Sequence, residues 1–87
     1  MAKRIFKYEL DAAVCQRIMM PKGATILSVQ WQHGVLCMWA SVDPESPPEL
    51  RHFVLAGTGD LTPDGPFLQT LQANGGGIVL HLFEVSP

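Results

Sequence analysis

Hydrophobic and polar residues alternate along most of the chain with the period of two that is typical of β-strands. Near the start, Phe6, Tyr8 and Leu10 fall on one face, whereas Lys7 and Glu9 fall on the other. The same alternation returns in later segments, and no long segment carries the spacing of an amphipathic helix. We therefore predict about seven strands, over residues 4–10, 15–20, 25–32, 35–42, 50–57, 67–73 and 78–85.

Short connections that contain glycine or proline separate these strands. Pro21-Lys22-Gly23 and His33-Gly34 each favour a hairpin turn. Residues 43–49 contain three prolines and form a solvated loop. Parallel neighbours would need long crossovers, so an antiparallel meander is expected. The predicted fold is all-β, a small antiparallel sandwich or a partly closed barrel, in a single domain over residues 1–87.

Residues 35–42 differ from the other predicted strands because they are apolar on both faces. A strand of this kind is usually central and covered on each side. If the fold itself does not cover it, a second subunit must, because large apolar patches are rare on monomers. Val35, Cys37 and Trp39, together with Trp31, are therefore the candidate interface of a homodimer or of a complex with another protein.

Composition narrows the class of protein but not its function. The chain has 87 residues, of which 47% are hydrophobic and 16% charged, so a disordered chain is excluded. Its net charge of −2 is too weak to predict a nucleic-acid or membrane partner. The longest apolar run, residues 35–40, is far shorter than the roughly 20 residues of a membrane span. No apolar segment of a secretory signal follows the first residues, so the cytoplasm is the expected location.

Cys15 and Cys37 both lie in apolar strand patterns, and we expect them to be reduced and buried, although the sequence also permits a disulfide between them. With three histidines they make no ligand set of recognisable spacing, so no metal site is predicted. No catalytic or cofactor-binding residues are predicted either. The remaining enzymatic or small-ligand hypothesis places a pocket near the 57–66 loop that uses Thr58, Asp60 or His81.

Five of the six basic residues lie in the first quarter of the chain. If the first two strands pair, these residues form a small basic patch, with Tyr8 and Trp31 as stacking groups for bases. The alternative interpretation is an ordinary set of solvated strand faces and protected edges. The candidate basic patch consists of Lys3, Arg4, Lys7, Arg17 and Lys22.

Several segments resemble a family of small uncharacterised bacterial and phage-associated proteins that share a domain of unknown function. The resemblance is carried by residues 3–10 (KRIFKYEL), 20–30 (MPKGATILSVQ), 36–44, 53–59 and 77–84, and it is weakest over 60–74. It implies a compact β fold and an origin in bacteria or integrated phage, but no activity and no catalytic residues.

These observations favour a non-enzymatic binding or assembly module that acts through a β surface or a sheet edge. The first alternative is a nucleic-acid-associated accessory protein that uses the basic patch. The second is a small-ligand binder or enzyme with a site near the 57–66 loop. The sequence alone does not identify the partner, and it names no cofactor.

Overall fold

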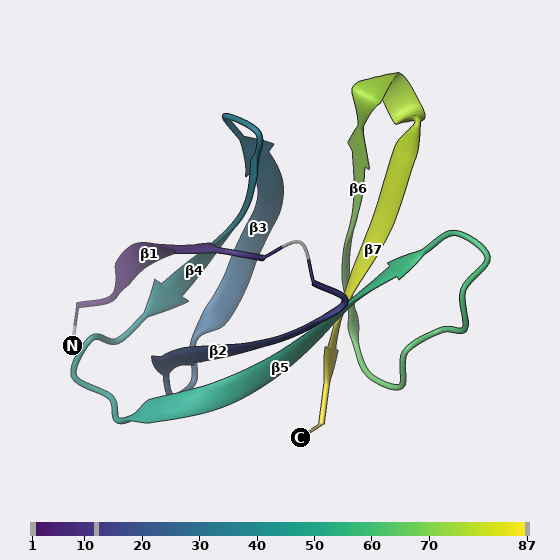
Figure 1. Cartoon of the computed structure of the whole chain (residues 1–87). Coiled ribbons are helices and arrows are strands. Elements are labelled where there is room, and N and C mark those ends of the chain that lie inside the picture. Colours follow the sequence, from purple (N-terminus) through teal and green to yellow (C-terminus); the bar gives the residue numbers. More distant parts are fainter. Residues whose placement is uncertain (1, 12, 87) are drawn as a thin grey trace.

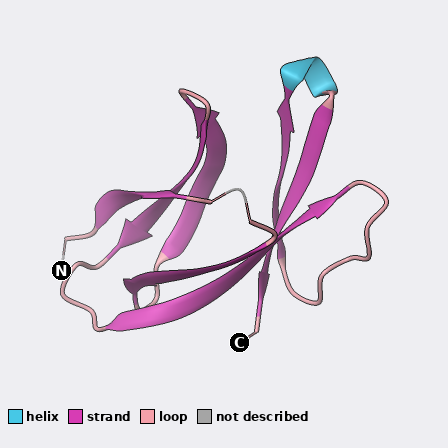
Figure 2. Ribbon diagram, viewed as in Figure 1, coloured by secondary structure: helices cyan, strands magenta, loops and turns pink. Residues whose placement is uncertain are grey.

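The computed structural model describes residues 2–11 and 13–86, and these form seven β-strands and one short 3-10 turn (Figure 1, Figure 2). The predicted strands are confirmed, with their ends shifted by a few residues at most. The elements are β1 (Arg4–Glu9), β2 (Cys15–Pro21), β3 (Thr25–Gln32), β4 (Val35–Val42), β5 (Pro48–Gly57), β6 (Phe67–Ala73), η1 (Asn74–Gly76) and β7 (Ile78–Val85).

The strands form two antiparallel sheets that face each other as a sandwich. One sheet has the order β1-β4-β3, and the other has the order β2-β5-β7-β6. Within the described residues these two sheets are separate, so the sandwich is the correct one of the two predicted architectures. Figure 1 shows that the β3–β4 and β6–β7 hairpins project toward the same end of the molecule and that their turns lie apart from each other.

The expected meander is wrong, because the chain crosses between the sheets at the β1–β2, β2–β3 and β4–β5 connections. In particular, Pro21-Lys22-Gly23 does not close a hairpin. It carries the chain from β2 in one sheet to β3 in the other. Each sheet has an apolar face that needs a second layer, and these crossings supply that layer from strands adjacent in sequence.

β4 is the central strand of the three-stranded sheet, as its two apolar faces predict. Its inward-facing residues, Leu36, Met38, Ala40 and Val42, are all buried in the core. The preceding His33-Gly34 turn has positive φ at both residues, 51° and 79°, which matches the primed turn predicted for this hairpin.

The two cysteines have different environments. Cys37 is buried, as expected, and only 2% of its surface is exposed. On the same face of the sheet, the Lys7 ammonium of β1 donates to Gln32 Oε1 of β3 at 3.0 Å. This hydrogen bond passes over β4, the strand that carries Cys37. The expectation for Cys15 is wrong: Cys15 begins β2 on the outer face of the four-stranded sheet and is exposed. Both are free thiols.

The Arg51 side chain lies inside the sandwich and joins the four-stranded sheet to the β2–β3 turn, which leads into the other sheet. Its guanidinium donates two hydrogen bonds to the Glu84 carboxylate, both at 2.7 Å, and a third to the backbone carbonyl of Ala24 in the β2–β3 turn. The hydrogen bonds to Glu84 raise the pKa of Arg51 against the opposing effect of burial. The guanidinium also lies 6.0 Å from the centroid of the Phe53 ring. One side chain thus connects β5, β7 and the β2–β3 turn.

We expect Arg51→Met to destabilise the protein by about 2 kcal/mol, because it leaves the Glu84 carboxylate half-buried without its partner and the Ala24 carbonyl without its donor. Methionine keeps most of the apolar stem, so lost packing contributes little. Urea denaturation measures the change. The matched control is Arg17→Met on an exposed outer face, which should shift stability by no more than about 0.5 kcal/mol. Equal effects of the two substitutions would show that Arg51 does not tie the layers.

Candidate functional site: a cleft between the sheets

An apolar cleft of about 430 Å³ opens between the two sheets at one end of the sandwich. This is the end at which β1 and β5 finish and β4 and β7 begin, and we call it the cleft end. The opposite end, which holds Arg51 and the β2–β3 turn, is the Arg51 end. The residues that line the cleft are Leu10, Asp11, Ala13, Val14, Trp31, Gly34, Val35, Leu36, Leu55, Gly57, Asp60 and Leu80.

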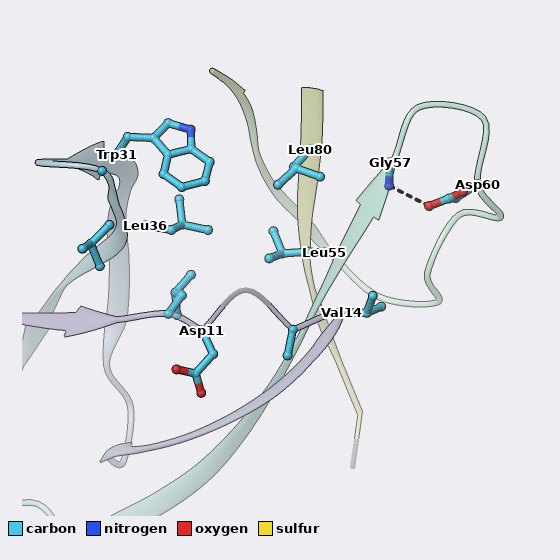
Figure 3. Close-up of a pocket in the computed structure, with 12 residues that line it drawn as sticks. Asp11, Val14, Trp31, Leu36, Leu55, Gly57, Asp60 and Leu80 are labelled. Carbon is cyan, nitrogen blue, oxygen red and sulfur yellow. Dashed lines mark hydrogen bonds between the residues drawn. The ribbon is translucent and has the colours of Figure 1, made fainter. Parts of the chain in front are cut away.

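The two walls of the cleft come from different sheets. Trp31 and Leu36 are cross-strand partners in β3 and β4, so both side chains leave the same face of the three-stranded sheet. Leu55 and Leu80 come from β5 and β7 in the other sheet. Figure 3 shows the first pair on one side of the cleft and the second pair on the other. The cleft is therefore an open continuation of the hydrophobic core.

Gln16 hydrogen-bonds the backbone of Asp11 and Ala13, which form the lower border of the cleft. This side chain is buried, and its Oε1 accepts from the Asp11 N–H at 2.8 Å. Its amide nitrogen donates to the carbonyls of Asp11, at 2.6 Å, and Ala13, at 3.1 Å. Two backbone bonds add to this: Leu10 donates to the Leu36 carbonyl, and Leu55 donates to the Val14 carbonyl. These bonds fix the lower border of the cleft to both sheets.

The charged residues that line the cleft are both acidic. Asp60 is held in place because its Oδ2 accepts from the Gly57 N–H at 2.8 Å (Figure 3). Asp11 lies at the opposite border, where its carboxylate points away from Trp31. No lysine or arginine lines the cleft. The site thus combines apolar walls with a negative border.

The lining of the cleft is mostly apolar, and its two charged side chains, Asp11 and Asp60, are carboxylates. A concave, mostly apolar site with a few polar groups is the usual form of a small-molecule binding site, and 430 Å³ lies within the usual volume range.

The structure places all three residues of the hypothesis for the 57–66 loop, Thr58, Asp60 and His81, around one hollow. The Thr58 hydroxyl lies 3.0 Å from His81 Nε2, and the Thr70 hydroxyl lies 2.9 Å from His81 Nδ1. The imidazole therefore connects the loop to β7 and β6. These contacts border a second hollow of about 220 Å³, which Asp60 also lines.

A hydroxyl next to an imidazole is the basic unit of nucleophilic catalysis, but here the second ring nitrogen meets another hydroxyl instead of an orienting carboxylate. The Asp60 carboxylate accepts from the Gly57 N–H. A neutral imidazole satisfies both hydroxyls, since it donates through one nitrogen and accepts through the other. The arrangement therefore positions the start of the loop next to the cleft.

We expect His81→Ala to release the start of the 57–66 loop, because it removes the hydrogen bond that connects Thr58 to β7 and the one by which Thr70 of β6 positions the imidazole. Amide hydrogen exchange of residues 57–62 should become several-fold faster while exchange in β4 is unchanged. His52→Ala on the same sheet is the control and should leave the loop unchanged. Equal exchange in both variants would show that His81 does not hold the loop.

The predicted interface residues do not share one surface. Val35, Cys37 and Trp39 alternate with the core residues of β4 and so belong to the outer face of the three-stranded sheet, although Val35 also borders the cleft. Trp31 belongs to the inner face, where it lines the cleft with 38% of its surface exposed.

The candidate basic residues are exposed and distributed over several parts of the molecule. Lys7 pairs in register with Trp39 on the outer face of the three-stranded sheet. Arg17 pairs with His52 on the outer face of the other sheet. Lys22 lies in the β2–β3 turn, and Lys3 and Arg4 lie at the start of β1. Lys7 and Arg17 therefore point away from each other across the sandwich.

Sequence analysis missed most of the cleft. Leu10, Leu36, Leu55 and Leu80 carry the same alternation as any core leucine, so no pattern distinguishes them. The sequence does single out three lining residues, but for other roles: Trp31 and Val35 for a protein interface, Trp31 also for base stacking, and Asp60 for a loop pocket. The site depends on which strand ends meet across the two layers, and the sequence pattern does not contain that information.

Residues 2–11 and 13–86 hold no group of three or more histidine, cysteine, aspartate or glutamate side chains placed to bind a metal ion. The same residues include no helix with the length and hydrophobicity that a membrane crossing requires.

The fold and the cleft define an antiparallel β-sandwich with an open apolar site between its layers. The chain belongs to the family described as a domain of unknown function, DUF7352, whose model matches residues 1–87. The predicted membership in a family of unknown function is thereby confirmed. No curated protein and no solved structure matches the chain.

Proposed function

We propose that this protein is a non-enzymatic binding module whose cleft takes a compact, largely apolar small molecule. The observation that carries this proposal is the cleft itself, with leucines of both sheets and Trp31 facing a space of about 430 Å³. A bound ligand would cover apolar walls that otherwise face water, which is favourable by about 25 cal/mol for each Å².

The size and depth of the cleft favour a small molecule over a flat protein surface as its partner. Its walls lie between the layers, so a ligand is held from both sides. Gln16 and the backbone bonds at its border keep these walls in place before a ligand arrives. A preformed site of this kind binds with little loss of conformational entropy.

The nucleic-acid alternative has less support. A backbone-tracking surface needs several basic groups on one face. Lys7 and Arg17 lie on opposite outer faces, and the Lys7 ammonium is bound to Gln32.

We also propose that the protein is located in a reducing compartment such as the cytoplasm. Two free thiols, one of them exposed, support this location, because disulfides form and persist in oxidising compartments. An origin in bacteria or their phages rests on the sequence resemblance alone.

Trp31 provides a direct test. In Trp39→Phe, Trp31 is the single tryptophan. Adamantylmethanol, a compact apolar alcohol without absorbance of its own, should shift the Trp31 emission to shorter wavelength with a saturable curve. From the usual binding energy per ligand atom we expect a Kd between about 10 µM and 1 mM.

The matched control is Trp31→Phe, in which the remaining tryptophan, Trp39, lies on the outer face of its sheet. It should show no saturable change. Leu80→Phe, which adds volume to one wall, should weaken the response of the Trp39→Phe protein several-fold. A linear response of Trp31, or equal responses of both tryptophans, would refute binding in the cleft.

A further inference from the structure

We propose that the cleft selects small organic cations, molecules that join an amine to a compact apolar body. This inference rests on the proposed function, since it names the chemical class of the ligand for the same site. It follows from where the topology places the charged residues relative to the cleft.

The strand directions separate acidic from basic residues along the sandwich. β1 and β5 run toward the cleft end, so Asp11 and Asp60 follow the ends of these strands at the cleft. Arg4 begins β1 and Lys22 follows β2, and both lie at the Arg51 end. Arg51 itself has the Glu84 carboxylate as its partner.

Two other basic residues lie closer to the middle of the molecule, but a sheet separates each from the cleft. Lys7 leaves the outer face of the three-stranded sheet, where its ammonium binds Gln32. Arg17 leaves the outer face of the four-stranded sheet, next to His52. Among the described residues, the lining of the cleft therefore includes two acidic side chains, Asp60 and Asp11, and no lysine or arginine, and the Asp11 carboxylate points away from Trp31.

The apolar walls strengthen this charge preference. An ammonium inside the cleft is partly removed from water, so its attraction to a carboxylate is less screened than at an open surface. The Asp60 carboxylate is held by the Gly57 N–H and needs little reorganisation. The indole of Trp31 lines the cleft, and aromatic rings of this kind attract cations. A carboxylate ligand would meet repulsion from the same groups.

A matched series of ligands on one apolar body tests this inference. Adamantylmethylamine, adamantylmethanol and adamantanecarboxylate are titrated into the Trp39→Phe protein at low salt and pH 8, above the range in which histidines usually titrate. With an ammonium several ångströms from two carboxylates, we expect the amine to bind roughly tenfold more tightly than the carboxylate. The alcohol should lie between them, and added salt should narrow the difference.

Charge-removing variants assign the preference to named residues. Asp11→Asn and Asp60→Asn should each reduce the ratio of amine to carboxylate affinity by about threefold. Asparagine at position 60 keeps a side-chain oxygen that can accept from the Gly57 N–H. The control is Glu45→Gln, which removes the same charge from an exposed loop at the Arg51 end and should leave the ratio unchanged.

The outcomes separate this inference from the proposed function. If the alcohol binds and the amine binds no more tightly than the carboxylate, the charge preference is refuted and the apolar site stands. If none of the three ligands gives a saturable Trp31 response, the proposed function fails as well. If all three carboxyl variants change the ratio equally, the effect belongs to net charge and the inference is overturned.

Discussion

The contact of Arg51 with Glu84 and the Ala24 carbonyl is the interaction on which the shape of this sandwich depends. A small sandwich has limited core volume, so its layers need defined contacts to hold their spacing. At the Arg51 end one guanidinium joins β5 to β7 through two hydrogen bonds to Glu84 and reaches the β2–β3 turn, which leads into the other sheet, through a third. It also lies 6.0 Å from the centroid of the Phe53 ring. The layers pack against each other at this end because the guanidinium between them is hydrogen-bonded. The Glu84 carboxylate and the Ala24 carbonyl thereby both have a donor.

At the cleft end, the residues that the structure describes place no comparable ion pair or side-chain hydrogen bond across the space between Trp31 and Leu80. Its bonds run along the lower border, through Gln16 and the backbone of Leu10 and Leu55. On the far side, the Val29 N–H donates to Gln69 Oε1 and joins β3 to β6. In the described part of the chain, hydrogen bonds therefore connect the layers on both sides of the cleft but not across its mouth, where the turns of the two hairpins lie apart (Figure 1).

The local pattern of hydrophobic and polar residues predicts the strands well, because the formation of each strand depends on residues that are close in sequence. The His33-Gly34 turn and the two apolar faces of β4 are examples. Pairing of the layers was not predictable in the same way, since it depends on contacts distant in sequence. β3 shows a second limit. A bulge between Ile26 and Ser28 interrupts its register, and Leu27 is exposed there although simple alternation places it with Val29.

The sequence pattern predicts parts of the core but not the candidate site, because the site depends on contacts between residues that are distant in sequence. Leu55 and Leu82 are direct partners in β5 and β7, and both are buried. Leu80, two residues before Leu82 on the same strand, faces the cleft. A leucine of β7 therefore packs in the core at position 82 and lines the open cleft at position 80, and the difference is whether the opposite sheet covers it. A cleft of this type forms at the end of a sandwich, so it is recognised only when the relative placement of the two layers is known.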